Sequence, residues 1–490
     1  MESRFTFTGT ISAQEICHIA RGEADVSLSP AVLQSLERCR ERADLASRSV
    51  PVYGRSTGVG ANKTTEACLD RVEQGMDLLR SHSVQSGSPY SQSEIRAMVA
   101  VRLNQLCNPG SGIEPRILEG LCNVLSSKTL PVINHFGSVG TADLSALANL
   151  GLAMVGEKEG IPKELRIEPI SSESALPLIS SSAMTIGSAV LICDRLRKIL
   201  AAESVTYALT LVTAKGNLSP FTQSAIDAVC VETAAAVAAQ VLHCVQDCRW
   251  EPKQIQDIYA LRAFLPARAS TMRSLSRLEQ QAVALANCAQ ENPLFPIDDC
   301  QGDSLMGARY GVIHHGAFLE TALAHELDGM ALSLAQEVPL VLGRVTMLND
   351  SRHTGLPRFL APRQAGTSGT MIVEYVAASA AGEVYAAVSP VSAYSAVLSN
   401  GLEEDATYAT TSAMKLQRAV DAFETMVACE LLEAVRACHI SGTDTKLPGG
   451  GPLAEAIAMT DEKISKNMSD RSLSDDLEAL KKNLGAYAEI

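Results

Sequence analysis

The sequence has few aromatic residues, no excess of positive charge and no long apolar run, and these shortages exclude several classes of protein. Aromatic residues make up 4% of the 490 positions. Lys and Arg total 41 against 55 Asp and Glu, so the net charge is −14, whereas nucleic-acid-binding proteins usually carry a basic excess. The longest apolar stretch, Leu144–Gly156, contains Asn149 and is shorter than the roughly 18 residues that a membrane-spanning helix needs. We therefore expect neither a nucleic-acid nor a membrane partner.

The cysteines do not form the pattern of a disulfide framework or of a zinc site. There are 13, an odd number, and no Cys-x-x-Cys pair occurs. The nearest candidate for a metal cluster is His243, Cys244 and Cys248, but the two cysteines lie four residues apart in an Ala/Val-rich helical stretch, where buried free thiols are the commoner case. The segment Met1–Ser12 also lacks the apolar core of a secretory signal. We expect no metal site and a cytoplasmic location.

Helix-type spacing of apolar residues dominates the chain after about residue 160. Apolar residues make up 46% and charged residues 20%, an ordinary globular composition. Long windows have little Pro or Gly inside them: Ser188–Lys215, Thr222–Cys248, Ser274–Ala289, Ala317–Val338 and Thr407–Cys438. Proline stands instead at the predicted joints: Pro220, Pro252, Pro266, Pro293, Pro296, Pro357, Pro362 and Pro390. The pattern predicts a mainly α protein with a long central antiparallel helical bundle.

The distribution of Gly, Pro and polar residues also predicts how the chain divides into three regions. Residues 1–160 are rich in Gly and short polar loops, which predicts a smaller mixed N-terminal region. We expect the helical bundle to occupy residues 161–445. The polar tail, 446–490, is expected to be a terminal helix or partly disordered.

The segment Tyr53–Gly60 (YGRSTGVG) is the first candidate for a functional loop. Three glycines within seven residues allow the backbone to turn tightly and approach a ligand. The segment lacks the Lys-Ser/Thr ending of a phosphate-binding loop. Taken alone, its composition favours a surface turn over a site.

Further motifs in a fixed order change that interpretation. After Tyr53–Gly60 come Ser81-His82, Ser86–Pro89, Ile95–Met98, Arg102–Asn104, Gly110–Gly112, Gly137–Gly140, Asp143-Leu144, Gln256–Arg262, Asn292-Pro293, Ser368–Ile372 and Glu404-Asp405. Together they resemble the aromatic amino acid lyase family, which contains histidine, phenylalanine and tyrosine ammonia-lyases and related aminomutases. The resemblance runs from about Tyr53 to about residue 440. It implies a helical homotetramer whose active sites combine loops from three chains.

The resemblance also implies a reaction and a prosthetic group. Family members remove an amine from Cα and a proton from Cβ of an aromatic amino acid, using a methylidene-imidazolone formed from an Ala-Ser-Gly tripeptide. Here only Thr141 and Ala142 stand between Gly140 and Asp143, so two residues occupy the space of three. The ring needs a glycine nitrogen and a serine that dehydrates, and neither is present. We therefore predict no methylidene-imidazolone and no other cofactor, and we expect Thr141 and Ala142 to line the substrate site.

Several further residues of this sequence match individual functional positions of the family. Tyr53 matches the loop tyrosine that exchanges the Cβ proton, although a base role needs a lowered phenol pKa. Arg262 matches the arginine that holds the substrate carboxylate, a task that suits its forked guanidinium. Tyr259 matches a second catalytic tyrosine and lies three residues before Arg262, so the two side chains should face the same way on a helical turn. His82 matches a substrate-side histidine, and Glu404 a glutamate near the amine.

Departures from the family gather around the amine end of the site. The family's Gln-Glu-Asp reads Glu403-Glu404-Asp405, and its Asn-Gly-Thr reads Ser180–Ser182, so Ser180 is a further candidate for substrate contact. The family's Asn-Phe-His-Gly reads Ile313–Gly316, and its Ser-Glu-Asn reads Gly382–Val384. The tyrosine and arginine positions are kept while those around the electrophile are lost. This asymmetry favours a retained site with altered chemistry.

Two hypotheses follow. The first is a carbon–nitrogen lyase that acts on an aromatic amino acid or a derivative by proton transfer and β-elimination without the prosthetic group, as ergothionase-like members do with betaines. An isomerase or a cyclase that uses the same tyrosine is a variant of it. The second is a non-catalytic member that binds an aromatic amino acid through Arg262 or partners an active relative. A panel of aromatic amino acids and their trimethylammonium betaines separates the two, because only an enzyme forms a product.

Overall fold

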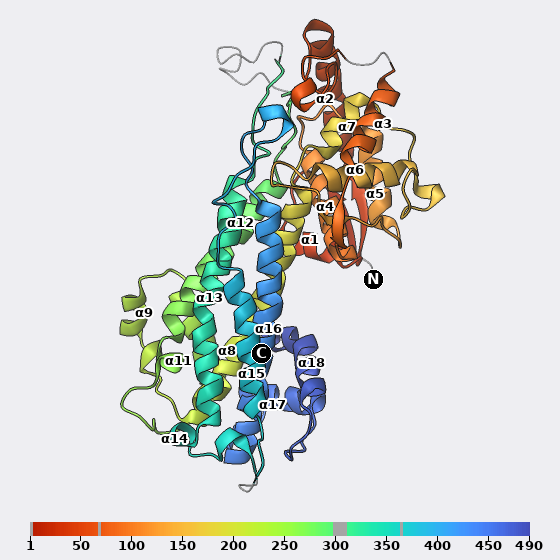
Figure 1. The fold of residues 1–490 in the computed structure, drawn as a ribbon. Coiled ribbons are helices and arrows are strands. Elements are labelled where there is room, and N and C mark those ends of the chain that lie inside the picture. The colour runs from red at the N-terminus through yellow and green to blue at the C-terminus, as the bar shows by residue number, and fades with distance from the viewer. Residues whose placement is uncertain (1–2, 67–69, 297–310, 363–365) are drawn as a thin grey trace. The chain divides into compact units, whose positions relative to one another are not determined.

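The computed structural model describes residues 3–66, 70–296, 311–362 and 366–490 (Figure 1). The chain divides into two compact units. Unit 1 comprises Met1–Leu191, Leu278–Leu327 and Val391–Met414, and unit 2 comprises Ile192–Arg277, Asp328–Pro390 and Lys415–Ile490. This division differs from the predicted boundaries at 160 and 445, because the chain leaves and re-enters each unit inside long helices. These helices are α8 (Ala183–Ala214), α12 (Phe264–Ala286), α13 (Thr321–Asn349) and α16 (Ala409–Ser441).

Unit 1 combines helices with two small sheets, as the sequence predicted for the N-terminal region. Strands β1 (Ser3–Phe7) and β2 (Ala24–Leu28) pair in parallel, and β3 (Ser86–Pro89) pairs antiparallel with β4 (Asn134–Phe136). The shorter helices of this unit are α1 (Ala13–Ala20), α2 (Pro30–Ser49), α3 (Arg71–His82), α4 (Gln92–Cys107), α5 (Pro115–Ser126), α6 (Leu144–Val155) and α7 (Ser172–Ile179). Helix is the main regular structure of the described part of this unit, which agrees with the predicted mainly α class.

Helix α4 shows how local sequence and burial fix this unit. Ser91 and Glu94 form a capping box: the Ser91 hydroxyl accepts from the Glu94 amide at 3.2 Å, and the Glu94 carboxylate accepts from the Ser91 amide at 2.8 Å. Every residue from Ala97 to Cys107 is buried, so the helix lacks a polar face. Its buried Arg102 is neutralised by Glu291, with 2.9 Å between the Nη2 and Oε1 atoms. The helix is therefore a central element of unit 1.

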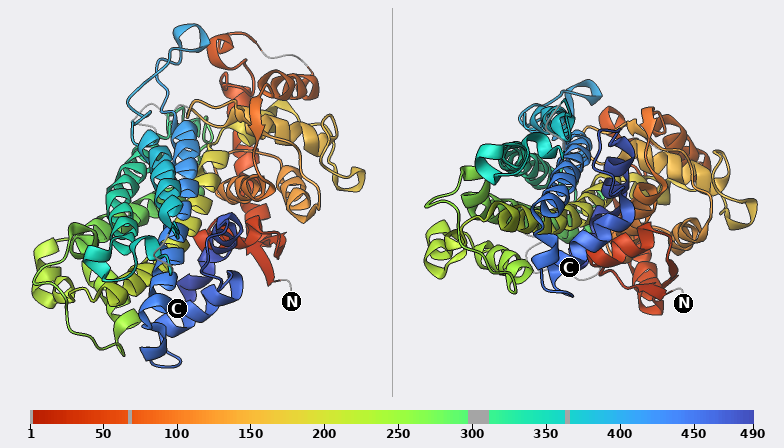
Figure 2. Two further views of the ribbon diagram at one scale, coloured as in Figure 1. Left: turned by 60° about the horizontal axis from the view of Figure 1, so that its bottom comes forward. Right: turned by 90° about the horizontal axis from the view of Figure 1, so that it is seen from below.

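Unit 2 is a helical bundle held by apolar packing and buried ion pairs (Figure 2). Besides the ends of the long helices it contains α9 (Gln223–Val229), α10 (Ala234–Val245), α11 (Tyr259–Arg262), α14 (Ser351–Thr354), α15 (Met371–Ala386), α17 (Pro452–Lys463) and α18 (Ser474–Asn483). Arg268 of α12 pairs with Glu337 of α13 at 3.0 Å, and Arg344 of α13 pairs with Glu430 of α16 at 2.7 Å. Both arginines also pair with Glu203 of α8. These contacts join all four long helices.

Most of the predicted long helices are present, with two differences in their limits. The window Thr222–Cys248 is broken, because Cys230 adopts a left-handed conformation (φ 55°) that ends α9 before α10 begins. Helix α13 continues through Pro339, whereas the sequence predicted an end at Val338. Pro266 lies in the first turn of α12 and not at a joint, since the missing N–H of proline costs nothing there.

Two further findings concern the tail and the apolar segments. The tail contains α17 and α18, and Leu477 and Leu480 of α18 are buried, so its described part is helical and packed.

Two helical segments, Ser172–Ala214 and Thr321–Asn349, are long and apolar enough to span a membrane by length and composition. In their most apolar windows 89% and 61% of the residues are buried in the fold, as in core helices of soluble proteins.

Candidate functional site

Unit 1 contains a cavity of about 850 Å³ that brings together most of the predicted site residues. Its lining includes Tyr53, His82, Thr141, Ala142, Ser180 and Glu404, each of which the sequence had singled out. Apolar side chains form another part of the lining: Val59, Leu144, Leu176, Ile179, Phe318, Leu319 and Leu402. The cavity therefore offers an apolar wall that suits a ring, and polar groups that suit an amino-acid backbone.

The loop that begins at Tyr53 folds back on its own tyrosine. The Gly60 amide donates a hydrogen bond to the Tyr53 hydroxyl at 2.7 Å. Gly54 is required because it has a φ of 69° and because a Cβ there would lie 2.1 Å from the Leu176 side chain. Burial raises the pKa of Tyr53, the Gly60 amide lowers it, and the charge of Glu403 raises it, with a net increase. Tyr53 is thus held as a neutral phenol, which is opposite to the shift that a resting phenolate base requires.

His82, at the C-terminal end of α3, lines the cavity and has one ring nitrogen engaged by the protein. Its Nδ1 lies 2.9 Å from the Leu78 carbonyl oxygen and 3.0 Å from the Ser81 hydroxyl. A carbonyl oxygen accepts only, so Nδ1 carries the proton and donates to it. In the neutral ring, Nε2 is then left as a hydrogen-bond acceptor.

The turn from Gly140 to Asp143 forms a tight corner of the cavity. Thr141 pairs with Leu319 in an isolated β-bridge, and Ala142 adopts a φ of 72°. The Gly140 carbonyl accepts from the Thr407 hydroxyl at 2.9 Å, and the Asp143 amide donates to the Ser181 carbonyl at 2.8 Å. The turn is therefore held from both sides by hydrogen bonds.

The Asp143 carboxylate also stabilises this turn through hydrogen bonds. It accepts from the Thr185 amide at 2.8 Å and from the hydroxyls of Thr185 and Thr410 at 3.1 and 3.2 Å. Burial raises the pKa of Asp143, and these donors oppose the increase. Thr185 and Thr410 are far apart in sequence and carry no motif, so sequence reasoning missed them.

Acidic residues border the cavity at the segment Glu403–Asp405. All three lie exposed in the single chain. Glu403 pairs with Leu398 through a backbone bond of 2.7 Å, and Asp405 accepts from the Ser395 hydroxyl at 2.8 Å. Among the described residues that line the cavity there is no Lys or Arg. The negative charge at this end of the cavity therefore favours the binding of a cation.

Ser180 completes the predicted set in unit 1. It ends α7, lines the cavity and accepts a hydrogen bond from the Asn292 amide at 3.3 Å. Asn292 also lines the cavity and accepts from the His315 amide at 3.0 Å. The serine is thus partly engaged by the protein itself.

Tyr259 and Arg262 form α11 in unit 2 and are not among the residues that line this cavity. The Arg262 guanidinium lies over the Tyr259 ring at 4.3 Å, so the two side chains do face the same way. Tyr259 is 68% exposed, and Arg262 borders a separate cavity of about 290 Å³ together with Asn217 and Gln256. The pair is therefore available to a ligand or to another chain.

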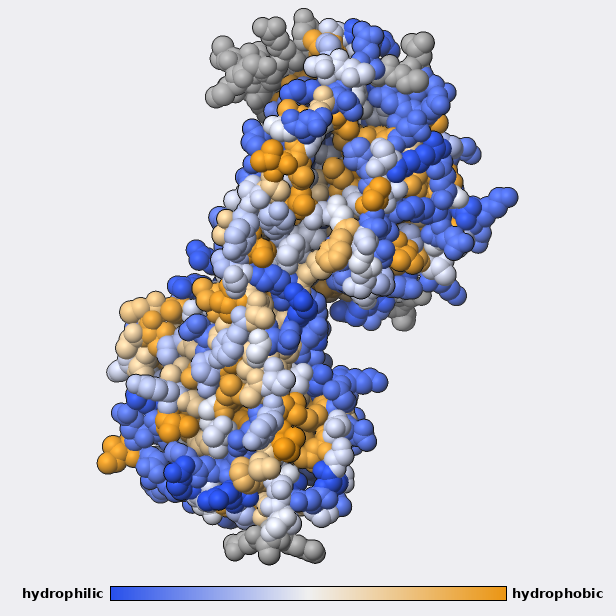
Figure 3. All heavy atoms as spheres, viewed as in Figure 1, coloured by the Kyte–Doolittle hydropathy of each residue, from blue (hydrophilic) through white to orange (hydrophobic). Residues whose placement is uncertain are grey.

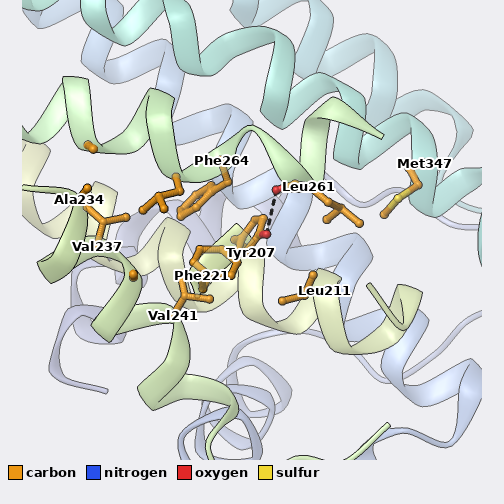
Figure 4. Close-up of a cluster of buried hydrophobic side chains, with 12 residues drawn as sticks. Tyr207, Leu211, Phe221, Ala234, Val237, Val241, Leu261, Phe264 and Met347 are labelled. Carbon is orange, nitrogen blue, oxygen red and sulfur yellow. Dashed lines mark hydrogen bonds between the residues drawn. The ribbon is translucent and has the colours of Figure 1, made fainter. Parts of the chain in front are cut away.

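An apolar cluster holds α11 in place (Figure 4). It contains Tyr207, Leu211, Phe221, Leu261, Phe264 and Met347, with others. The Tyr207 hydroxyl donates to the Leu261 carbonyl at 2.9 Å, and its ring stacks on Phe264 at 4.0 Å. Leu261 anchors α11 in the cluster, whereas Tyr259 is exposed and Arg262 is half-buried.

The fold and the site define a helical lyase-type enzyme whose cavity carries a tyrosine loop and a corner at Gly140–Asp143. The sequence model of the family described as "Aromatic amino acid lyase" matches residues 11–462. The chain belongs to this family. The sequence resemblance is confirmed, since the match covers most of the chain.

Named relatives support the same family. A histidine ammonia-lyase of Geobacillus sp. (strain WCH70) is 27% identical over 491 residues, which cover 96% of this chain and 94% of that protein. Among solved structures, the ergothionase of Treponema denticola has a TM-score of 0.89 at 19% identity, covering 99% of both chains. The histidine ammonia-lyase of Trypanosoma cruzi has a TM-score of 0.88 at 23% identity, covering 99% of this chain and 94% of the other. The predicted helical lyase fold is thereby confirmed.

Proposed function

We propose that this chain is a carbon–nitrogen lyase that eliminates an amine from an amino-acid-derived substrate without a methylidene-imidazolone group. The observation that carries the proposal is the cavity of unit 1, where Tyr53, an acidic segment and an apolar wall meet. A tyrosine that exchanges a proton contributes about 10²–10⁴-fold to a rate. The remaining activation then has to come from the substrate itself.

The residues at the corner of the cavity do not fit the prosthetic group of the family. Ring closure needs a flexible glycine nitrogen and a serine that loses water, whereas this position holds Thr141 and Ala142. The Gly140 carbonyl and the Asp143 amide are engaged by Thr407 and Ser181. We therefore route no step through such a group.

The acidic lining supports a substrate that carries a permanent positive charge on nitrogen. A quaternary ammonium leaves as a neutral amine, so its departure needs no covalent electrophile. Glu403, Glu404 and Asp405 would stabilise such a cation in the bound state. The ergothionase that shares the fold is described as degrading ergothioneine, and a trimethylammonium betaine of an aromatic amino acid is accordingly our first candidate.

A panel assay tests the proposal. Purified protein is incubated with histidine, phenylalanine, tyrosine and their trimethylammonium betaines, and the absorbance of an α,β-unsaturated acid is followed. We expect product from a betaine and an intact mass equal to that of the unmodified chain. A mass lower by two waters, one from ring closure and one from serine dehydration, together with turnover of free histidine or phenylalanine, would contradict the proposal. Saturable binding with no product would favour a non-catalytic binder, and a rearranged product would favour an isomerase or cyclase.

We further propose a cytoplasmic homotetramer in which Tyr259 and Arg262 serve the cavity of another copy. The family resemblance implies loops from three chains in each site, and Arg262 has a carboxylate-binding guanidinium that does not line the cavity of unit 1. A stripe on α15 supports assembly, because Ile372, Tyr375 and Tyr385 are 58%, 66% and 48% exposed. Figure 3 shows apolar and weakly polar residues at the surface of unit 2 around α15 and α16.

A further inference from the structure

We propose that Glu403 is the final acceptor of the Cβ proton and acts through Tyr53, which relays the proton across the cavity. This inference rests on the proposed function, since it assigns the base of that reaction. The pair stands in one cavity within unit 1, and both side chains line it.

Glu403 lies close to the backbone group that binds Tyr53. The Gly60 amide donates to the Tyr53 hydroxyl at 2.7 Å, and the Oε1 atom of Glu403 lies 3.9 Å from the point where a Cβ on Gly60 would stand. The Ser399 hydroxyl accepts from the Ala61 amide at 3.1 Å, which ties the loop after Tyr53 to the segment that carries Glu403. The Leu398–Glu403 backbone pairing then orients the glutamate.

The protonation state of Tyr53 explains why a second group is needed. Burial and the charge of Glu403 raise the phenol pKa, so a phenolate is rare at neutral pH. The phenol oxygen accepts one hydrogen bond from Gly60 and keeps a second lone pair for an incoming proton. A phenol can take up this proton only if it gives up its own at the same time.

The step moves two protons and one electron pair within the cavity. The substrate Cβ–H bond breaks, and its proton goes to the Tyr53 oxygen. The original phenol proton passes to the Glu403 carboxylate, and the electron pair of the C–H bond becomes the new C=C bond as the C–N bond breaks. The amine departs with the electrons of that bond, so no oxidant, reductant or further proton is required. Glu403 then releases its proton to solvent, to which it is exposed in the single chain.

The experiment compares wild type with Glu403→Gln, Glu403→Asp and the control Glu159→Gln, an exposed acid that does not line the cavity. The probe is ergothioneine, with kcat and KM measured over pH. For Glu403→Gln we expect kcat to fall at least tenfold, KM to rise by a smaller factor because Glu404 and Asp405 still attract the cation, and the acidic limb of the pH profile to disappear. Glu403→Asp should restore part of kcat, and the control should match wild type. The other titratable side chains on the cavity lining, His82, Glu404 and Asp405, remain in every variant.

A second measurement is independent of turnover. The ultraviolet difference titration between wild type and Tyr53→Phe reports the Tyr53 phenol, and the same difference is taken in the Glu403→Gln background. We expect the Tyr53 midpoint to fall when the negative charge is removed. An unchanged midpoint, or an unchanged kcat in an active enzyme, would overturn the relay. Absence of product and of Cβ–deuterium exchange with every probe in wild type contradicts the proposed function instead, and the titration still decides whether the two residues are coupled.

Discussion

At the scale of single residues, the site uses burial to hold acids in their protonated form. Glu320 follows Leu319 of the cavity lining, is 2% exposed and accepts a hydrogen bond from the Gln290 side-chain amide. Burial, together with the nearby charge of Asp143, raises the pKa of Glu320 to about 7. An acid buried in this way is a group whose protonation differs between the folded and unfolded chain.

Substitution of Glu320 by Gln tests this burial through the pH dependence of stability. Because the pKa of Glu320 in the folded chain is raised above its ordinary value of 4.5, the favourable contribution to stability is complete below about pH 4.5 and is lost as pH rises through 7. The shift corresponds to about 3 kcal/mol, at 1.36 kcal/mol for each pKa unit. Urea unfolding at pH 5 and pH 8 should show that Glu320→Gln gains stability relative to wild type mainly at pH 8. An equal gain or loss at both pH values would show that Glu320 does not titrate differently on folding, and Glu159→Gln serves as the control.

The individual residues differ in how far the sequence could place them. Tyr53, His82, Thr141, Ala142, Ser180 and Glu404 were predicted and do line one cavity, because each belongs to a motif whose order is readable. The neutral phenol of Tyr53 was not predictable, since it depends on burial and on Glu403, which lies 350 positions further along the chain. Glu320 carries no motif, and its environment arises only when distant segments pack.

At the scale of secondary-structure elements, the corner Gly140–Asp143 has a conformation that its sequence does not favour. Ala142 is left-handed, which costs an L-residue roughly 1–2 kcal/mol. Gly140 is also left-handed, and a Cβ there would lie 2.1 Å from the Thr407 hydroxyl. A methyl group at Gly140 would therefore clash with Thr407, whereas removal of the methyl group at Ala142 would relieve backbone strain.

A matched pair of substitutions measures this difference. Ala142→Gly should stabilise the protein by about 0.5–1 kcal/mol, because relief of the left-handed alanine outweighs the greater freedom of glycine in the unfolded chain. Gly140→Ala should destabilise it by more than about 1 kcal/mol, because the clash adds to the strained φ. Both are measured by denaturant unfolding. Two changes of the same sign would mean that the turn adopts another conformation in solution.

The long helices were predictable from apolar periodicity, but the ion pairs that join them were not. Windows such as Ser188–Lys215 and Thr407–Cys438 correspond to α8 and α16, since helix spacing is a local property. Arg344 lies in α13 and is fully buried against Glu203 and Glu430 from two other helices. A charged residue in a helix pattern usually indicates a solvated face, so the burial of Arg344 could not be predicted from the sequence.

Removal of one partner from this network should be costly. Arg344→Met leaves Glu430 buried without its cation and leaves Glu203 with Arg268 alone, and breaking such a buried pair costs about 3–5 kcal/mol. The free energy of unfolding is compared with that of Arg352→Met, a matched arginine that is 86% exposed and pairs with Asp350 at 2.6 Å. The exposed variant should change stability by less than about 1 kcal/mol. Similar losses in both variants would argue against a burial penalty in the bundle.

At the scale of the whole molecule, the residues predicted for the site are divided between the two units. Tyr53 belongs to the cavity of unit 1, and Arg262 belongs to α11 of unit 2. Local periodicity and motif order identified both residues, but neither property indicates which copy of the chain supplies each of them. That information resides in the symmetry of an assembly.

Complementation between two inactive variants decides this point. Tyr53→Phe and Arg262→Ala are each expected to lose activity, the first in proton transfer and the second in carboxylate binding. If the two residues of a site come from different subunits, subunits mixed at random by co-expression place both native residues in about a quarter of the sites of a symmetric homo-oligomer. Activity should then return to about a quarter of the wild-type value in the mixture, while each variant alone stays inactive. Failure to recover any activity in mixed oligomers, verified by mass spectrometry with two different tags, would show that each chain supplies both residues to its own site.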